Sequence, residues 1–454
     1  NLFRLTPERA ALIRRKLLRN GSVLICGPGT GISDGTQLTA QPASAYPRIE
    51  LDGSGGNISL ASGISFTTSG ANTGGGVMWS LSGDNTVAGA ITLASGNGSS
   101  KIVVNGGSLT LAGAIAPNTA GRVLILDGTA AGNVTGAIAD GGANVLALTK
   151  TGTGSWTLTG TNTYTGVTAI NTGALEIGGA GQLGGGTYTN IITNSASFIY
   201  GSTANQVLGG AITGTGSITK TGSGTLTLAT NNNYGGRTTV SDGILEITAV
   251  TGFIAGSTNI TVSGGTLSIL NTGNVIGDSC PLFLDGMMSL AAGVNETVQS
   301  LYIGGMQCPT GTWGSTASPA AYKDNGHFSG SGMIMCTVGP SGNDGSWSVD
   351  ADGAWSVTNN WTNGVVALGG SRIAWFTNSI LDDRIVTNDY STLNIGQLVF
   401  GSPSEFSWTL AGNTVFLTNA PKPVIRVNTN TATVLAVLAG AGGLIKDGGG
   451  TLVL

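Results

Sequence analysis

The amino-acid sequence predicts an all-β protein, a right-handed parallel β-helix (β-solenoid) repeat protein with a short N-terminal α-helix. Three observations predict this fold. Glycine fills 78 of 454 positions and charged residues only 9%, against ordinary shares of about 7% and about 25%. The segment at 150–177 recurs in related form at 220–247. Short stretches of alternating apolar and polar residues, bounded by glycine-containing turns, fill most of the remainder.

The composition excludes several classes of protein. A net charge of -4 with a mean hydropathy of +0.24 excludes a disordered chain, which needs low hydrophobicity and high net charge. A pI near 5.0 argues against a nucleic-acid partner, because such proteins are basic. No apolar run reaches the roughly 18 residues that a membrane-spanning helix needs, so no membrane span is expected in this segment.

The repeat is the strongest signal. Residues 150–177 and 220–247 agree at 14 of 28 positions, and Lys150 aligns with Lys220. A third copy begins at Leu444–Leu454. Self-similarity of this kind indicates stacked units, none of which buries a core alone.

Within each unit the apolar residues alternate with a period of two. Trp156 and Leu158 are expected to face the core, and Thr157 and Thr159 to face outward. The same alternation recurs at Ser108–Gly113, Ala174–Ile177, Thr225–Ala229 and Thr266–Leu270. Because helical patterns are nearly absent between these strands, the chain is expected to wind as a solenoid, right-handed by the rule for parallel crossovers. A β-sandwich or a propeller is the alternative.

The two copies resemble the autotransporter-associated β-strand repeat of secreted bacterial surface proteins. Both keep its order of Thr-Lys-x-Gly-x-Gly-x-x-x-Leu, then Asn-x-Tyr-x-Gly, then Gly-x-Leu, although Arg237 stands where Thr or Gly is more usual. Leu301–Thr337 resembles the closing segment of such a block, and Trp347–Trp361 resembles the Trp-rich opening of the next. The resemblance covers most of residues 100–454. It implies a passenger-like β-helix that is exported and displayed on the cell surface.

The organisation follows from these segments. We expect a basic N-terminal helix and linker at 1–45, a first solenoid at 46–300, a capping segment at 301–340, a Trp-rich junction at 341–364 and a second solenoid at 365–454. The second solenoid stops in mid-repeat. We expect either an excerpt of a longer chain or a last turn that another molecule covers.

The N-terminal segment differs from the remainder of the chain. Thr6 and Pro7 suit a helix start and Asn20-Gly21 suits its end, which predicts a helix over Leu5–Arg19. Positions 1–20 hold six basic side chains and one acidic one, a net charge of +5, whereas positions 21–454 carry a net charge of -9. Three interpretations stay open: a cap on the first turn, docking onto an acidic neighbouring subunit, and binding to an anionic surface.

Motifs for cofactors and metals are incomplete. Val23–Gly35 is similar to a phosphate-binding loop, but Ile32-Ser33 stands where a Lys-Ser/Thr pair would be needed. Asp350–Gly353 could begin a calcium loop, yet the later ligands are missing. His327 is the single histidine and has no second ligand at metal-site spacing. The sequence therefore predicts no cofactor and no metal.

Catalytic signals are equally weak. Acid/base catalysis needs paired carboxylates, and the adjacent pair Asp382-Asp383 is the only one in the sequence. Four tryptophans gather within 29 positions, where they could stack on carbohydrate or pack at the junction between solenoids; they are Trp347, Trp355, Trp361 and Trp375. We therefore expect no enzyme.

Four cysteines allow three pairings if all are bridged. Cys308 and Cys336 flank one compact segment and are the preferred pair. A disulfide between them implies an oxidising, extracellular setting.

These features predict a non-enzymatic extracellular structural protein that polymerises end to end with copies of itself into a cell-surface filament or fibrous layer. The residues expected at that interface are Arg9, Arg14, Arg15, Lys16, Arg19, Cys26, Thr451, Leu452, Val453 and Leu454. The alternative is an autotransporter passenger acting as an adhesin, with glycans or other cell-surface proteins as partners on a lateral face. A remote alternative is a polysaccharide-active β-helix enzyme, because some lyases and hydrolases use this fold.

Overall fold

The structure is a computed structural model that describes most of the chain. It covers residues 2–4, 15–18, 23–26, 37–40, 48–69, 76–94, 98–248, 252–308, 310–339, 342–419, 422–440 and 443–454. Within these ranges every regular element is a β-strand or a short 3-10 turn, and none is an α-helix. Consequently, no helix in the described residues is long and apolar enough to cross a membrane.

The chain divides into two compact units. The first comprises Asn1–Gly277 with Gly286–Val294, and the second comprises Asp278–Asp285 with Asn295–Leu454.

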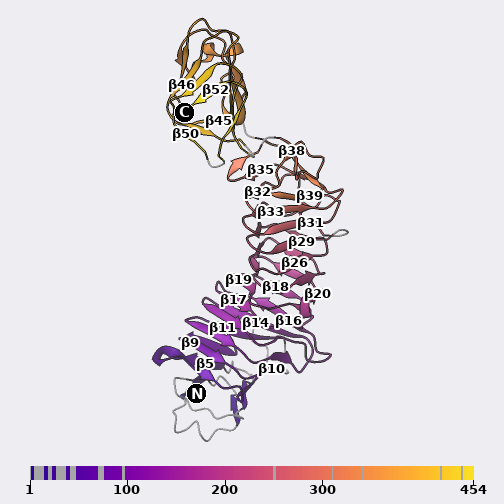
Figure 1. The fold of residues 1–454 in the computed structure, drawn as a ribbon. Coiled ribbons are helices and arrows are strands. Elements are labelled where there is room, and N and C mark those ends of the chain that lie inside the picture. Colours follow the sequence, from indigo (N-terminus) through magenta and orange to yellow (C-terminus); the bar gives the residue numbers. More distant parts are fainter. Residues whose placement is uncertain are drawn as a thin grey trace. The chain divides into compact units, whose positions relative to one another are not determined.

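The first unit is a parallel β-solenoid, as the sequence predicts. Its strands stack in parallel, turn upon turn (Figure 1). Val103 pairs with Asp127 and Leu148 pairs with Thr168, so each strand is hydrogen-bonded to its counterpart in the next turn. The longest sheet that lies wholly in this unit consists of β1 (Leu2–Arg4), β3 (Val23–Cys26), β5 (Arg48–Asp52), β8 (Met78–Ser82), β11 (Ser99–Val104), β14 (Arg122–Gly128), β16 (Leu146–Lys150), β18 (Thr168–Ile170), β21 (Ile192–Asn194), β24 (Ile212–Gly214) and β27 (Asn233–Tyr234).

Two further sides complete each turn. The second side consists of β6 (Ser59–Leu60), β9 (Asp84–Val87), β12 (Ser108–Leu111), β15 (Ala131–Val134), β17 (Ser155–Leu158), β19 (Ala174–Ile177), β22 (Ser197–Tyr200), β25 (Ser217–Lys220), β28 (Thr238–Val240) and β30 (Ile260–Val262). Over the early turns the third side consists of β2 (Arg15–Leu18), β4 (Gln37–Ala40), β7 (Ser65–Ser69), β10 (Ile91–Ala94) and β13 (Ile115–Pro117). Over the later turns it consists of β20 (Thr187–Tyr188), β23 (Gln206–Leu208), β26 (Thr225–Leu228), β29 (Ile244–Ile247), β31 (Thr266–Ile269) and β33 (Met287–Leu290). Two short 3-10 turns are η1 (Gly53–Gly55) and η2 (Gly184–Gly186).

The core lies inside the solenoid and follows the period of two. Trp156 and Leu158 are fully buried, and Thr157 between them is partly exposed. Leu175 and Ile177 repeat the arrangement one turn later. Each such side chain stabilises the fold by about 1.5–3 kcal/mol through burial. The predicted inward and outward faces are confirmed here.

The helix predicted over Leu5–Arg19 is wrong at Arg15–Leu18. These four residues form β2, which pairs in parallel with Gln37–Ala40 of β4. Pairing with the next turn supplies backbone hydrogen bonds that local capping signals do not reveal, and helix propensity is a weak guide against tertiary pairing. Residues 5–14 and 19, which include Arg9, Arg14 and Arg19, lie outside the described residues.

The second unit carries two sheets whose strands also pair in parallel. One consists of β41 (Gly345–Ser346), β43 (Gly369–Phe376), β45 (Leu393–Phe400), β47 (Val415–Leu417) and β50 (Leu438–Ala439), with β48 (Val424–Val427) and β51 (Ile445–Asp447) joined through β45. The other consists of β42 (Gly353–Ala354), β44 (Arg384–Asn388), β46 (Trp408–Gly412), β49 (Thr431–Val434) and β52 (Thr451–Val453).

Shorter strands precede these two sheets in the second unit. They are β32 (Leu282–Leu284), β34 (Asn295–Val298), β35 (Leu301–Ile303), β36 (Met306–Gln307), β37 (Gly311–Gly314), β38 (Tyr322–Lys323), β39 (Phe328–Gly330) and β40 (Met333–Cys336). The 3-10 turns η3 (Thr358–Asn360) and η4 (Thr362–Gly364) follow them.

The clustered tryptophans form part of the core of the second unit. Trp347, Trp355 and Trp361 are buried and their rings pack around Phe376. The Trp355 indole donates a hydrogen bond of 2.8 Å to the Ala367 carbonyl. Burial leaves no face of these three rings for a sugar, and they pack within the second unit; a junction between two solenoids stays a prediction.

Candidate ligand-binding groove

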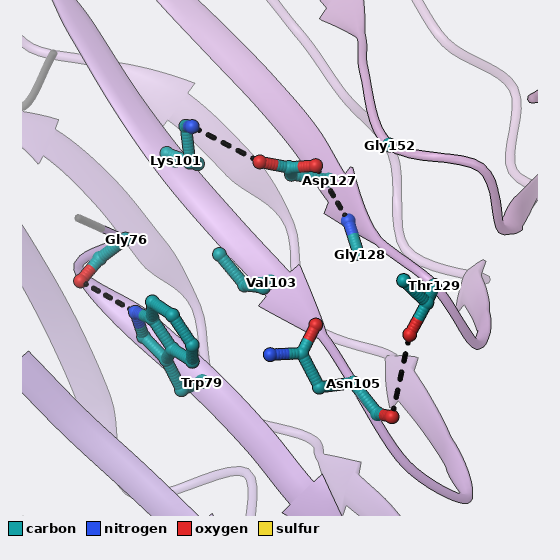
Figure 2. Close-up of a pocket in the computed structure, with 9 residues that line it drawn as sticks. All are labelled: Gly76, Trp79, Lys101, Val103, Asn105, Asp127, Gly128, Thr129 and Gly152. Atoms are coloured by element: carbon teal, nitrogen blue, oxygen red, sulfur yellow. Dashed lines mark hydrogen bonds and ion pairs between the residues drawn. The ribbon is translucent and has the colours of Figure 1, made fainter. Parts of the chain in front are cut away.

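A groove of about 210 Å³ opens on the outer face of the first unit, across β8, β11 and β14 (Figure 2). Its lining comes from consecutive turns and combines one aromatic ring, one ion pair, two polar side chains and several glycines. The lining residues are Gly76, Trp79, Lys101, Val103, Asn105, Asp127, Gly128, Thr129 and Gly152.

The strand register creates this groove. Trp79 pairs with Val103, and Val103 pairs with Asp127, so the three side chains form one column across the sheet. Lys101 lies two residues before Val103 on the same face of β11, because alternate residues of a strand share a face, and Asn105 directly follows the end of that strand. Figure 2 shows Val103 between Trp79 and Asp127. With strands about 4.8 Å apart, this column spans about 10 Å along the solenoid.

An ion pair borders one side of the groove. Lys101 Nζ lies 3.0 Å from Asp127 Oδ2, and each side chain is about one-fifth exposed. Burial raises the pKa of Asp127, but hydrogen bonds from Lys101 and from the Gly128 backbone outweigh burial and hold that pKa below its usual value. The Asp127 carboxylate is therefore charged at neutral pH, and its charge cancels that of Lys101.

The Trp79 ring is fixed at one end of the groove. Its Nε1 donates a hydrogen bond of 3.0 Å to the Gly76 carbonyl. The Arg48 guanidinium lies 5.1 Å from the ring centroid and is ion-paired to Glu50 at 2.5 Å. Because Arg48 and Glu50 belong to β5, on the opposite side of β8 from β11, they support the ring away from Val103.

Gly76 leaves room for the Trp79 ring. A Cβ atom at this position would lie 2.8 Å from Trp79 Nε1 and 2.6 Å from Val103 Cγ2. Any larger residue would therefore displace the indole or the Val103 side chain.

The groove offers polar and aromatic groups that can bind a ligand. Asp127 is its one carboxylate, and acid/base hydrolysis of a glycosidic bond needs two. Among the described residues, no group of three or more His, Cys, Asp or Glu side chains could hold a metal ion. What the groove offers is an aromatic face, an ammonium group, an amide and a hydroxyl.

The residues predicted at an assembly interface belong to both units. Arg15 and Lys16 lie in β2 of the first unit, and Cys26 is buried in β3, where burial raises its pKa to about 12. Thr451–Val453 form β52 of the second unit and pair with β49, and Leu454 is exposed. Their role in assembly stays a prediction.

The structure brings Cys308 and Cys336 together as buried thiols beside β35. The Cys336 thiol donates a hydrogen bond of 3.5 Å to the Val338 carbonyl. Burial raises the pKa of both thiols, and the neighbouring Cys336 raises that of Cys308 further. A disulfide between them stays a prediction.

The polar residues of the candidate calcium and metal motifs form contacts within the protein. Asp350 accepts a hydrogen bond from Arg384 at 2.7 Å, and Asp352 accepts one from the Ile385 backbone at 2.8 Å, so both carboxylates join successive turns. His327 Nδ1 lies 2.7 Å from Asp324 Oδ2. Of the loop at 23–35, only β3 lies within the described residues.

Sequence reasoning missed the groove. Apart from Gly152, none of its lining residues belongs to a repeat copy, and no motif marks them. A usable signal exists: outward residues of the strands at Met78–Ser82, Ser99–Val104 and Arg122–Gly128 combine a tryptophan, a lysine and an aspartate. Recognising this combination requires knowing which residues of successive strands pair, and the sequence alone does not give that register.

Comparisons with known proteins agree with the repeat pattern. The family model of the passenger-associated-transport-repeat matches residues 148–177 and 218–247. The Adhesin BmaC autotransporter of Brucella suis biovar 1 (strain 1330) is 35% identical over 132 residues, which are 29% of this chain and 4% of that protein. No solved structure matches the chain. The segments at 148–177 and 218–247 are therefore autotransporter-associated β-strand repeats.

Proposed function

We propose that this chain is part of a surface-displayed autotransporter passenger that acts as a non-enzymatic adhesin. The observation that carries the proposal is its 35% identity to a stretch of the Adhesin BmaC autotransporter. The chain spans about 4% of that relative, so adhesion is proposed for this chain and not transferred from the whole protein.

The physical properties of the first unit support this role. A solenoid holds the outward side chains of successive turns in a fixed array. The groove between Trp79 and Gly152 lies on such an outward face. A pre-formed lateral site loses little conformational entropy on binding, which suits attachment through many weak contacts.

The comparison favours the adhesin alternative over the end-to-end filament. The relative's name describes adhesion, and no contact among the described residues bears on polymerisation. The filament therefore stays a prediction. Electron microscopy of the purified chain tests it, because a structural protomer would give continuous filaments.

Adhesion is tested by displaying the chain on a non-adherent laboratory bacterium and counting the cells that attach to cultured epithelial cells. The matched control displays an unrelated β-solenoid of similar length on the same anchor. We expect more attachment with this chain, and loss of that excess after surface proteolysis. Attachment equal to the control at equal display would contradict the proposal.

A further inference from the structure

We propose that the lateral groove binds one ring of a neutral saccharide, with the Trp79 indole as the stacking platform. This inference rests on the proposed function, because it names the ligand class of the same groove. Four features of the groove support it: the partly exposed Trp79 ring, the hydrogen-bonding groups around the ring, the pairing of the charged side chains, and the strands of the groove, which have no open edge.

The Trp79 ring offers an apolar face. Its N–H group is already bound to the Gly76 carbonyl at 3.0 Å, so the indole presents carbon atoms and π electrons to the groove. The ring is partly exposed, and the Arg48 guanidinium lies over it at 5.1 Å from the centroid. A pyranose ring has one face made largely of C–H groups, and an immobilised aromatic ring complements that face at low entropic cost.

The groups around the ring complement hydroxyls. The Lys101 ammonium has three N–H donors, of which one faces Asp127 Oδ2 at 3.0 Å. Asn105 is exposed and its amide both donates and accepts. Thr129 is exposed on the next turn, with its hydroxyl 3.4 Å from the Asn105 carbonyl oxygen. Sugar hydroxyls also donate and accept, so a mixed rim suits them better than it suits a ligand with acceptors alone.

The charges of the groove favour a neutral sugar. Lys101 is paired with Asp127, and Arg48 is paired with Glu50, so the two cations near the ring are both neutralised. An acidic sugar would bring its carboxylate into a groove that already holds the Asp127 carboxylate. The groove volume of about 210 Å³ is below the 300–1,000 Å³ of sites for drug-sized ligands, which limits the occupant to about one ring.

The backbone of the groove argues against an extended peptide as the ligand. β8, β11 and β14 each pair with a strand on both sides. They therefore present no open edge to which a peptide main chain could add as a further strand. Recognition must come from side chains, as saccharide binding requires.

The test applies the soluble full chain to an array of neutral oligosaccharides, ending in glucose, galactose or N-acetylhexosamine, and of sialylated and sulfated oligosaccharides. We expect binding to a neutral group, with at least a tenfold loss for Trp79→Ala, as for removal of an aromatic anchor. The matched control is Trp375→Ala, which removes a partly exposed tryptophan from β43 of the second unit and should keep full binding. Because Trp79→Ala removes a partly buried side chain, Asn105→Ala at an exposed position provides a second variant, with an expected loss of about threefold.

Each outcome decides the inference. Preference for acidic glycans, or unchanged binding by Trp79→Ala and Asn105→Ala, would overturn it. If no glycan binds while the displayed chain adheres and Trp79→Ala abolishes adherence, the ligand class is wrong and the adhesin proposal stands. If a neutral glycan binds through Trp79 while the displayed chain does not adhere, the saccharide site stands and the adhesin proposal fails.

Discussion

The Lys150 ammonium donates a hydrogen bond of 3.1 Å to the backbone carbonyl of Thr172, one turn further along the solenoid. It also binds the carbonyls of Thr151 and Gly152 on its own turn, at 2.6 and 2.8 Å. Lys220, its equivalent in the second repeat, binds the carbonyls of Gly222 and Asp242. The lysine at the start of each of these repeats therefore joins two adjacent turns.

Lys150 is fully buried, and burial of its ammonium group makes the stability of the fold depend on pH. Burial lowers the pKa of Lys150 to about 8, although Asp127 acts in the opposite direction. In the unfolded chain the lysine pKa is about 10.4, so between these two values the unfolded state binds more protons. We expect the Lys150 contribution, measured by urea unfolding as the difference in free energy of unfolding between the unchanged chain and Lys150→Met, to rise as pH increases from about 8 to about 10. The same slope in Lys150→Met would contradict this.

Replacing Lys150 should destabilise the first unit. Lys150→Met leaves three carbonyls without their partner, which should lower the free energy of unfolding by about 2–3 kcal/mol. The matched control is Lys446→Met, because Lys446 binds Gly448 and Gly450 in the same way at an exposed position. We expect the control to change stability by about 0.5 kcal/mol or less. Equal losses in both variants would contradict a role for burial.

Asn162 is a second link between turns. Fully buried, it accepts a hydrogen bond from the Ile138 backbone at 3.0 Å and donates to the Gly160 and Gln182 carbonyls. Asn162→Ala should therefore lower the free energy of unfolding by about 2–4 kcal/mol, measured by chemical denaturation. Asn118→Ala, at an exposed position, is the control and should have little effect. Similar stability of the two variants would refute the predicted role of Asn162.

Cys308 and Cys336 should form a disulfide in an oxidising compartment. The two thiols would lose two protons and pass two electrons to an external disulfide oxidant. Reduction should then lower the free energy of unfolding by about 3–4 kcal/mol for a loop of this length. Non-reducing peptide mapping by mass spectrometry tests the bond. Recovery of both residues as thiols from oxidised, exported protein would show that it does not form.

The sequence reveals most where its signals are local. The inward positions of Trp156 and Leu158 follow from the alternation of apolar and polar residues. Lys150 and Lys220, which join adjacent turns, occupy equivalent positions in the two aligned repeat copies. The N-terminal helix is wrong at Arg15–Leu18 because the strand partner of these residues belongs to the next turn, at Gln37–Ala40. The groove could not be predicted for the same reason. Trp79 and Asp127 lie in one column only because the lengths of the two intervening turns set the strand register.

The central claim is that this solenoid attaches to its target through the groove at Trp79. Its most direct test counts the attachment of bacteria that display the full chain with Trp79→Ala or Trp375→Ala, at equal surface levels. We predict at least a tenfold loss for Trp79→Ala, as for removal of an aromatic anchor, and full attachment for Trp375→Ala. Attachment of the Trp79→Ala bacteria at the level of the unchanged chain would contradict the account.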